Sequence, residues 1–179
     1  MSGKENVGTP KVLANNFARF IFCRPQCRLF TAKGTIPPLM GRYAVLNHQV
    51  NREISASSGR QDHFDLLLEF EGVLVTWELS VWLPTETQSI HRLPEHRLVY
   101  LDYQGPISNN RGSVTRVDQG QFELTQGQHP GNDCQLVLLN DQSKLSLQIH
   151  KLDAATENEQ WQLTQISCEP HNEIHPVDN

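Results

Sequence analysis

The stretch from His63 to Leu79 constrains the fold more than any other part of the chain, because it has the pattern of two strands joined by a tight turn. From His63 to Phe70 every second residue is Phe or Leu, and from Val73 to Leu79 every second residue is Val, Trp or Leu. A period of two is typical of β-strands, and Glu71-Gly72 between the runs is a turn signal. The stretch therefore predicts a β-hairpin with one apolar face in the core.

The other face of the first strand carries His63 and Asp65, followed by Leu67 and Glu69. An imidazole and a carboxylate two residues apart on one strand can hold a divalent metal ion with mixed nitrogen and oxygen ligands. The same pattern also fits a half-exposed strand with a His and an Asp in solvent. This stretch alone does not separate the two interpretations.

Further short runs of apolar and β-branched residues are separated by Gly, Pro, Asn and Asp. They predict strands at residues 42–50, 111–117, 121–124, 134–139, 145–152 and 161–166, with one or two more at 17–30. Residues 51–62 are predicted to form a polar, mobile loop. Because no segment shows a helical period over about ten residues, we expect an all-β fold, a compact β-barrel of about eight strands with little helix.

The length of 179 residues is enough for one domain with a hydrophobic core. We expect a basic N-terminal arm over residues 1–40, a barrel domain over residues 41–168 and a polar tail over residues 169–179. No run approaches the roughly 18 apolar residues of a membrane span, and the N-terminus lacks the apolar core of a signal peptide. We therefore expect a cytoplasmic protein without a membrane partner.

The charge is distributed unevenly along the chain. Residues 1–42 hold seven bases and one acid, so they carry +6, and the rest must carry −11 because the whole chain carries −5. A basic arm on an acidic body could bind nucleic acid, or it could dock on the acidic surface of its own chain. The sequence leaves both alternatives open.

Other functional signals are few. The four cysteines are predicted to be reduced thiols, because Cys23-x3-Cys27 is at most half of a zinc site and no second pair has finger-like spacing. The sequence also lacks a Gly-rich phosphate loop, a nucleophile elbow and a dinucleotide-binding fingerprint, so it does not match those enzyme classes.

Four motifs occur in a fixed order along the chain. They are Tyr43-x4-His48, His63-Phe64-Asp65-Leu66-x-Leu68-Glu69, Gly72-Val73-x3-Trp77 and His96-x3-Tyr100-x-Asp102-x2-Gly105. Together they resemble the 3'-phosphoesterase domain of bacterial DNA ligase D, and more closely its short stand-alone relatives. The resemblance covers about residues 41–166, and on it the chain is a divergent member of that group.

The resemblance implies a β-barrel that removes ribonucleotides and 3'-phosphates from DNA ends, with a manganese-type metal site for which zinc is the second choice. His48, His63 and Asp65 match the family's metal ligands. His96 matches a histidine that contacts the scissile phosphate, and Tyr100 matches a tyrosine beside it. The implied partners are DNA 3' ends or a primer-template, together with a DNA ligase and a polymerase of repair.

The chain departs from the family at four phosphate-binding positions. The family's glutamine, arginine, lysine and glutamate are replaced by Leu46, Leu67, Val81 and Pro94. Losing the arginine at position 67 removes a bidentate phosphate contact. Arg111 is the candidate replacement, with Arg97 and Arg116 as further options, although each also fits an ordinary surface arginine.

Two functions therefore remain open from the sequence. The first is a metal-dependent phosphoesterase that hydrolyses 3'-phosphate or 3'-ribonucleotide ends, with His96 and Tyr100 as catalytic residues and Arg111 as a phosphate contact. The second is a catalytically impaired barrel that keeps the metal ion and acts as a DNA-end or protein-binding module.

Overall fold

The computed structural model describes residues 39–83, 87–152 and 159–170. In chain order the elements there are β1 (Leu39–Val50), α1 (Arg52–Ser58), β2 (His63–Phe70), β3 (Val73–Leu79), β4 (Gln88–His96), the 3-10 helix η1 (Leu98–Leu101), β5 (Gly105–Pro106), the 3-10 helix η2 (Ser108–Asn110), β6 (Gly112–Gln126), β7 (Cys134–Leu139), β8 (Ser143–Leu152) and β9 (Gln160–Pro170). The predicted strands at 17–30, the Cys23-Cys27 pair and most of the predicted arm and tail lie outside the described residues.

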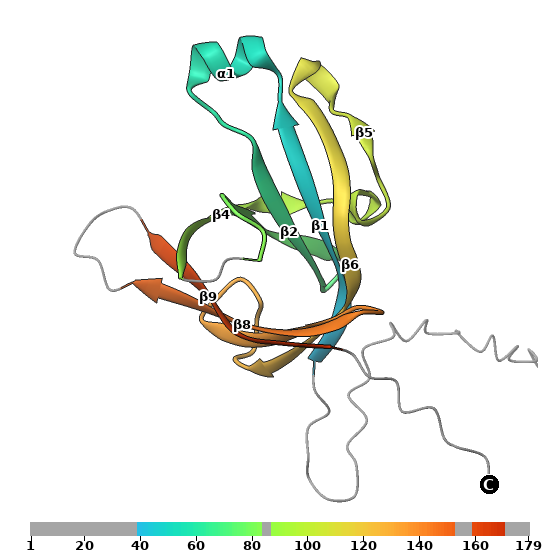
Figure 1. The fold of residues 1–179 in the computed structure, drawn as a ribbon, viewed down its shortest axis with the longest axis vertical. Helices are drawn as coiled ribbons and strands as arrows, with labels where there is room; N and C mark the ends of the chain where they lie inside the picture. Colours follow the sequence, from blue (N-terminus) through green and yellow to red (C-terminus); the bar gives the residue numbers. More distant parts are fainter. Residues whose placement is uncertain (1–38, 84–86, 153–158, 171–179) are drawn as a thin grey trace, which may run out of the picture. The chain divides into compact units, whose positions relative to one another are not determined.

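Eight strands close into a ring of antiparallel neighbours in the order β1-β2-β3-β4-β9-β8-β7-β6, and β6 pairs again with β1. Figure 1 shows β1, β2 and β6 side by side, with β8 and β9 running across their lower end. The ring is thinnest between β4 and β9, which pair only over Gln88–Ile90. The predicted fold class, an all-β fold of about eight strands with little helix, is confirmed, although the ring is not a regular barrel. None of the helices in the described ranges is both long and apolar enough to cross a membrane.

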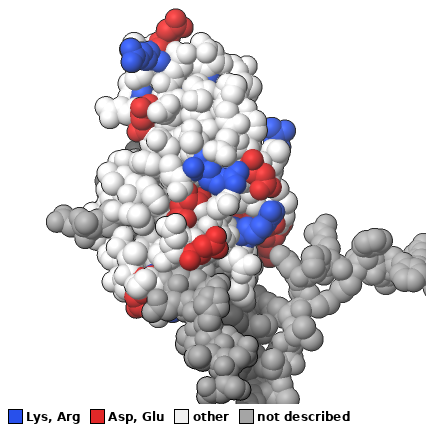
Figure 2. Space-filling model, turned by 45° about the vertical axis from the view of Figure 1, so that its right-hand side comes forward, with Lys and Arg blue, Asp and Glu red and all other residues white. Residues whose placement is uncertain are grey.

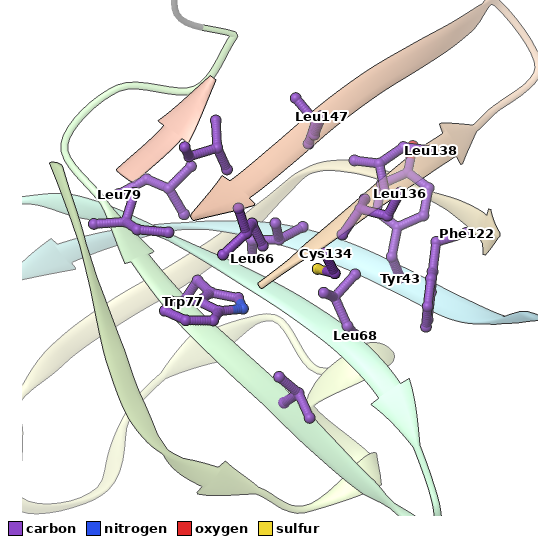
Figure 3. Close-up of a cluster of buried hydrophobic side chains, with 14 of the residues drawn as sticks. Tyr43, Leu66, Leu68, Trp77, Leu79, Phe122, Cys134, Leu136, Leu138 and Leu147 are labelled. Atoms are coloured by element: carbon purple, nitrogen blue, oxygen red, sulfur yellow. The ribbon is translucent and has the colours of Figure 1, made fainter. Parts of the chain in front are cut away.

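The interior of the ring is filled by alternate residues from all eight strands. Trp77 is fully buried there, packs edge-on against Trp161 at 5.0 Å between ring centroids, and donates from Nε1 to the carbonyl oxygen of Pro130 at 2.9 Å. Figure 3 shows Trp77, Leu66 and Cys134 converging in this core. Burying these large apolar side chains supplies most of the driving force for closing the ring.

The hairpin predicted from Glu71-Gly72 is present, and its turn fixes the register of the site strands. Glu71 and Gly72 have φ values of 50° and 88°, the pair of positive φ angles that a two-residue type I′ turn requires. Phe70 therefore pairs with Val73, and the ladder continues until Asp65 stands opposite Glu78.

The structure buries both faces of β2, which excludes the interpretation of a half-exposed strand. Leu67, on the face opposite the ring core, is 1% exposed. It belongs to a second apolar cluster whose buried members are Ala44, Leu46, Leu67, Leu74, Leu101 and Val114. This outer layer forms because the segment from η1 to η2 folds back over the outside of β1, β2 and β3, with Tyr100, Tyr103 and Ile107 packed against the cluster.

The prediction of an irregular loop over residues 51–62 is wrong in part, because the segment contains α1. The Asn51 side chain caps the helix by accepting from the N–H of Glu53 at 2.8 Å, and Gly59 ends it in the left-handed conformation with φ 72°. The seven residues of α1 are too few to show a helical period in the sequence.

Candidate metal centre

Three polar side chains are buried together on the outer face of β1 and β2. His48 and His63 are cross-strand partners with ring centroids 4.5 Å apart, and Asp65 lies two residues further along β2. Their exposed fractions are 8%, 4% and 7%. One ligand atom from each of the three lies within 4.8 Å of the others, so the structure brings together the three residues that the resemblance assigns to the metal.

Backbone carbonyls determine which nitrogen of each imidazole is free. Nδ1 of His63 lies 2.8 Å from the carbonyl oxygen of Gln61, and Nε2 of His48 lies 3.3 Å from that of Arg111. A carbonyl oxygen can only accept, so each of these nitrogens carries a hydrogen. The lone pairs therefore remain on Nε2 of His63 and Nδ1 of His48, which are the atoms nearest Asp65.

The spacing and the unpaired atoms fit a cation. Nδ1 of His48 and Nε2 of His63 each lie 3.6 Å from a different oxygen of the Asp65 carboxylate, beyond hydrogen-bond distance. Ligands that share one ion at about 2.1 Å stand roughly 3 to 3.6 Å apart. Nε2 of His63 and Oδ1 of Asp65 are buried without a hydrogen-bond partner in the described part of the chain, which is costly unless a ligand satisfies them. Two imidazoles and a carboxylate form a donor set suited to a divalent transition metal, with coordination positions left open.

A fourth polar side chain, that of Glu78, lies at the same site and did not stand out in the sequence. Its Oε2 lies 3.8 Å from Nε2 of His63 and 2.9 Å from Nη2 of Arg60. The two-residue turn sets the register of the hairpin, and this register pairs Glu78 with Asp65. The position of Glu78 beside the site could therefore be predicted from the sequence. Arg60 gave no such signal, because its position depends on the fold of residues 51–62.

His96 lies beside this cluster at the end of β4, and its ring is held from one side. Its Nδ1 is 2.8 Å from the carbonyl oxygen of Pro94 and 3.0 Å from Oγ1 of the fully buried Thr76. The Thr76 hydroxyl donates to the carbonyl of Leu74, so Nδ1 of His96 carries a hydrogen and Nε2 is left for a ligand. Tyr100 packs edge-on against the imidazole, with centroids 5.6 Å apart.

Arg111 takes part in the site through its backbone as well as its side chain. Its carbonyl oxygen is the acceptor for His48, and its Nε donates to the carbonyl of Ser108 at 3.1 Å. The residues before it, Asn109 and Asn110, both have positive φ, which Asn tolerates better than most residues. This tight turn places the Arg111 carbonyl beside the imidazole of His48.

A cavity of about 350 Å³ joins the pieces of the site. It is lined by His48, Asp65, His96, Tyr100 and Arg111, and also by Arg60. A larger hollow of about 600 Å³, lined by residues such as Arg42 and Asp118, contains Arg116 but none of the residues assigned to the metal or to catalysis.

Three of the four residues at which the chain differs from the family's phosphate-binding positions form the apolar side of the cavity. Leu46 and Leu67 are buried in the outer cluster, and Pro94 lies on the cavity wall. Val81 is 52% exposed and does not line the cavity. Of the other arginine candidates, neither Arg97 nor Arg116 lines it either.

Comparison with known protein families gives one match. Residues 55–165 match the family described as the DNA ligase D 3'-phosphoesterase domain, a stretch that includes His63, Asp65, His96, Tyr100 and Arg111. His48 precedes the matched stretch and is brought to it by the β1–β2 pairing. A search of curated proteins found no match to the chain.

Proposed function

Because the chain belongs to the DNA ligase D 3'-phosphoesterase domain family, we propose that it is a metal-dependent phosphoesterase that removes a 3'-phosphate or 3'-ribonucleotide from DNA ends. One observation carries the proposal. In the buried cluster of His48, His63 and Asp65, two ligand atoms have no hydrogen-bond partner among the described residues, and His48 and Asp65 line one cavity with His96. The partners of this function are DNA 3' ends, and a DNA ligase and a polymerase that use the resulting 3'-hydroxyl.

His48, His63 and Asp65 would hold the divalent cation, for which we propose manganese. Such an ion stabilises negative charge on phosphate oxygens and lowers the pKa of a coordinated water. The carbonyls of Gln61 and Arg111 keep both imidazoles in the ligating tautomer, which is the support that metal-binding histidines usually receive.

His96 acts on the phosphate itself, and Tyr100 lies beside it. With Nδ1 held by Pro94 and Thr76, the imidazole of His96 presents Nε2 to a substrate oxygen. A protonated Nε2 stabilises the charge that develops on that oxygen as the ester bond breaks. Tyr100 limits rotation of the imidazole by edge-on packing, and Arg111 supplies a cation on the cavity wall.

The second candidate function is a barrel that binds the ion and DNA ends, or a protein, without hydrolysis. It is favoured by the apolar wall that Leu46, Leu67 and Pro94 form in the cavity, because such a wall stabilises developing phosphate charge poorly. In this case the basic N-terminal arm would carry much of the affinity for DNA. Removing residues 1–38 should then weaken DNA binding and reduce its dependence on salt.

The deciding experiment is hydrolysis of a primer-template that ends in a 3'-phosphate or a 3'-ribonucleotide, with manganese, with zinc and with chelator. Manganese-dependent release of phosphate or of the ribonucleotide supports the phosphoesterase. If no product forms although one manganese ion is bound per chain, the phosphoesterase proposal is wrong and the binding module becomes the better account.

A further inference from the structure

Arg60 lies in a segment that the structure holds firmly beside the candidate metal centre. The N–H of Arg60 donates to Oγ of Ser58 at 3.2 Å, just beyond the capped end of α1. At the end of the segment, Asp62 accepts the N–H of Val50 at 2.8 Å and so joins it to the last residue of β1. The position of Arg60 is therefore determined by the fold, three residues before His63.

Two arginines line the cavity. Among the described residues that line it, Arg60 and Arg111 are the only arginines and no lysine is present, while Asp65 and Glu95 are the acids. Arg60 reaches it from the α1 segment, and Arg111 reaches it from the turn after η2. Two guanidinium groups at one cavity are a suitable partner for a group that carries two negative charges.

The guanidinium of Arg60 is available to a ligand. Its side chain is 45% exposed, and its hydrogen bond to Glu78 uses Nη2. In the described part of the chain the other nitrogens of this guanidinium have no hydrogen-bond partner. Exposed ion pairs of this kind contribute little to stability, so a phosphate can recruit the remaining donors, or all of them, at small cost.

We propose that Arg60 binds the terminal phosphate of the substrate and, together with Arg111, makes the site prefer a dianionic 3'-phosphate to an uncharged 3'-hydroxyl end. A phosphate monoester carries about −1.5 to −2 charges at neutral pH, which two guanidinium groups can balance. This inference rests on the proposed function, because it assigns the substrate class of the same site.

Binding of a substrate mimic tests Arg60 apart from catalysis. The probe is a fluorescent DNA primer-template whose 3'-phosphate is replaced by a phosphonate, since hydrolysis does not break its phosphorus–carbon bond. Its affinity is compared with that of the same DNA ending in a 3'-hydroxyl, by fluorescence anisotropy with manganese present. The proteins are the full-length wild type, Arg60→Ala, Arg60→Lys and, as the matched control, Arg52→Ala, which removes an exposed arginine of α1 that does not line the cavity.

Arg60→Ala should weaken phosphonate binding by roughly 10- to 100-fold, the loss expected for hydrogen bonds to a charged group, while binding of the 3'-hydroxyl DNA changes less than about twofold. Arg60→Lys should retain part of the preference for the phosphonate, because lysine keeps the positive charge but cannot form the two parallel hydrogen bonds of a guanidinium. Arg52→Ala should bind both ends as the wild type does. Equal losses for both ends in Arg60→Ala, no loss for either, or a wild type that does not prefer the phosphonate would overturn the proposal.

The same proteins distinguish failure of this inference from failure of the proposed function. If the wild type prefers the phosphonate through Arg60 but does not hydrolyse a 3'-phosphate, the phosphoesterase proposal fails and the role of Arg60 stands. If the wild type hydrolyses the 3'-phosphate and Arg60→Ala binds the phosphonate equally well, the role of Arg60 fails and the phosphoesterase proposal stands.

Discussion

Glu78 stands directly across the β2–β3 ladder from Asp65, so two carboxylates occupy neighbouring positions on one face of the sheet. Like charges that face each other across a ladder destabilise it, and Asp65 also has a buried oxygen with no hydrogen-bond partner among the described residues. Arg60 offsets the charge of Glu78 through its ion pair, but no lysine or arginine in the described part of the chain pairs with Asp65, whose neighbours are the imidazoles of His48 and His63. This arrangement is unfavourable without a bound cation, and it suggests that metal binding and stability are linked.

The first prediction is that manganese stabilises the fold and that Asp65→Ala abolishes this effect. At about 100 times its dissociation constant, an ion bound only by the folded state adds about 2.7 kcal/mol to the free energy of unfolding, or roughly 5–10 °C in the melting temperature. Thermal unfolding with manganese and with chelator measures this shift in melting temperature. Glu169→Ala, which removes an exposed carboxylate of β9, should keep the full shift. A shift of unchanged size in Asp65→Ala would place the ion elsewhere.

The second prediction is that His96→Ala lowers the rate of 3'-end hydrolysis by about 10²–10⁴-fold, as expected for a group that acts on the reacting phosphate. Manganese affinity should stay unchanged, because His96 is outside the cluster of ligand atoms. Rates and calorimetric titration of the ion are measured side by side. His150→Ala, an exposed histidine of β8, is the control and should retain wild-type activity. A parallel loss of metal affinity in His96→Ala would instead make His96 a ligand.

The third prediction concerns Leu67, where the family's arginine is missing. Leu67 lines the cavity, but it is only 1% exposed and packs in an apolar cluster. Leu67→Arg should therefore bury a guanidinium among apolar side chains, lower the free energy of unfolding by roughly 3 kcal/mol or more, and not restore a phosphate contact. Urea unfolding measures the loss. Leu67→Met, which nearly conserves volume, should cost less than about 1.5 kcal/mol. A Leu67→Arg variant of wild-type stability and raised activity would show that this side chain can turn into the cavity.

The fourth prediction is that Cys134 and Cys168 differ in their reactivity toward an alkylating reagent. Burial, with the nearby Asp133 as a second cause, raises the pKa of the Cys134 thiol to about 12. Cys134 therefore remains a thiol at pH 8 while the chain is folded, whereas Cys168 is exposed. Since the thiolate is the reactive form, iodoacetamide at pH 8 should modify Cys168 and leave Cys134 unmodified until urea unfolds the chain. Peptide mass spectrometry gives the extent at each site. Rapid modification of Cys134 in the native protein would contradict its placement in the ring core.

Much of the fold was predictable because the period of two and the turn residues are local signals. The hairpin around Glu71-Gly72 and the buried face of β2 follow from a few neighbouring residues. The second apolar layer was not predictable in the same way. Leu67 is buried only because a segment thirty or more residues later folds over it, and no local pattern encodes that contact.

The candidate site likewise contains residues that the sequence predicts and residues that it does not. The placement of His63 and Asp65 on one face follows from strand periodicity, and the pairing with His48 follows from the resemblance. Arg60 was missed because its side chain is positioned by α1, a helix whose caps are visible in the sequence at Asn51 and Gly59 but whose direction is not. The carbonyl of Arg111 is a backbone group, and a sequence motif does not record where a carbonyl points.

Side chains along β2 point alternately to the ring core and to the opposite face. The length of this strand is therefore as important for the site as its composition. Successive residues point in turn to the ring core and to the site, so deleting one residue within β2 would exchange the two sets over part of the strand. An imidazole or a carboxylate would then enter the ring, and a leucine or phenylalanine would replace it at the metal centre. We therefore expect β2 to tolerate no change in length, and changes in length to be confined to the connection between β1 and β2. The surface in Figure 2 carries acidic and basic side chains interspersed, and it is tolerant of change in a way that β2 is not.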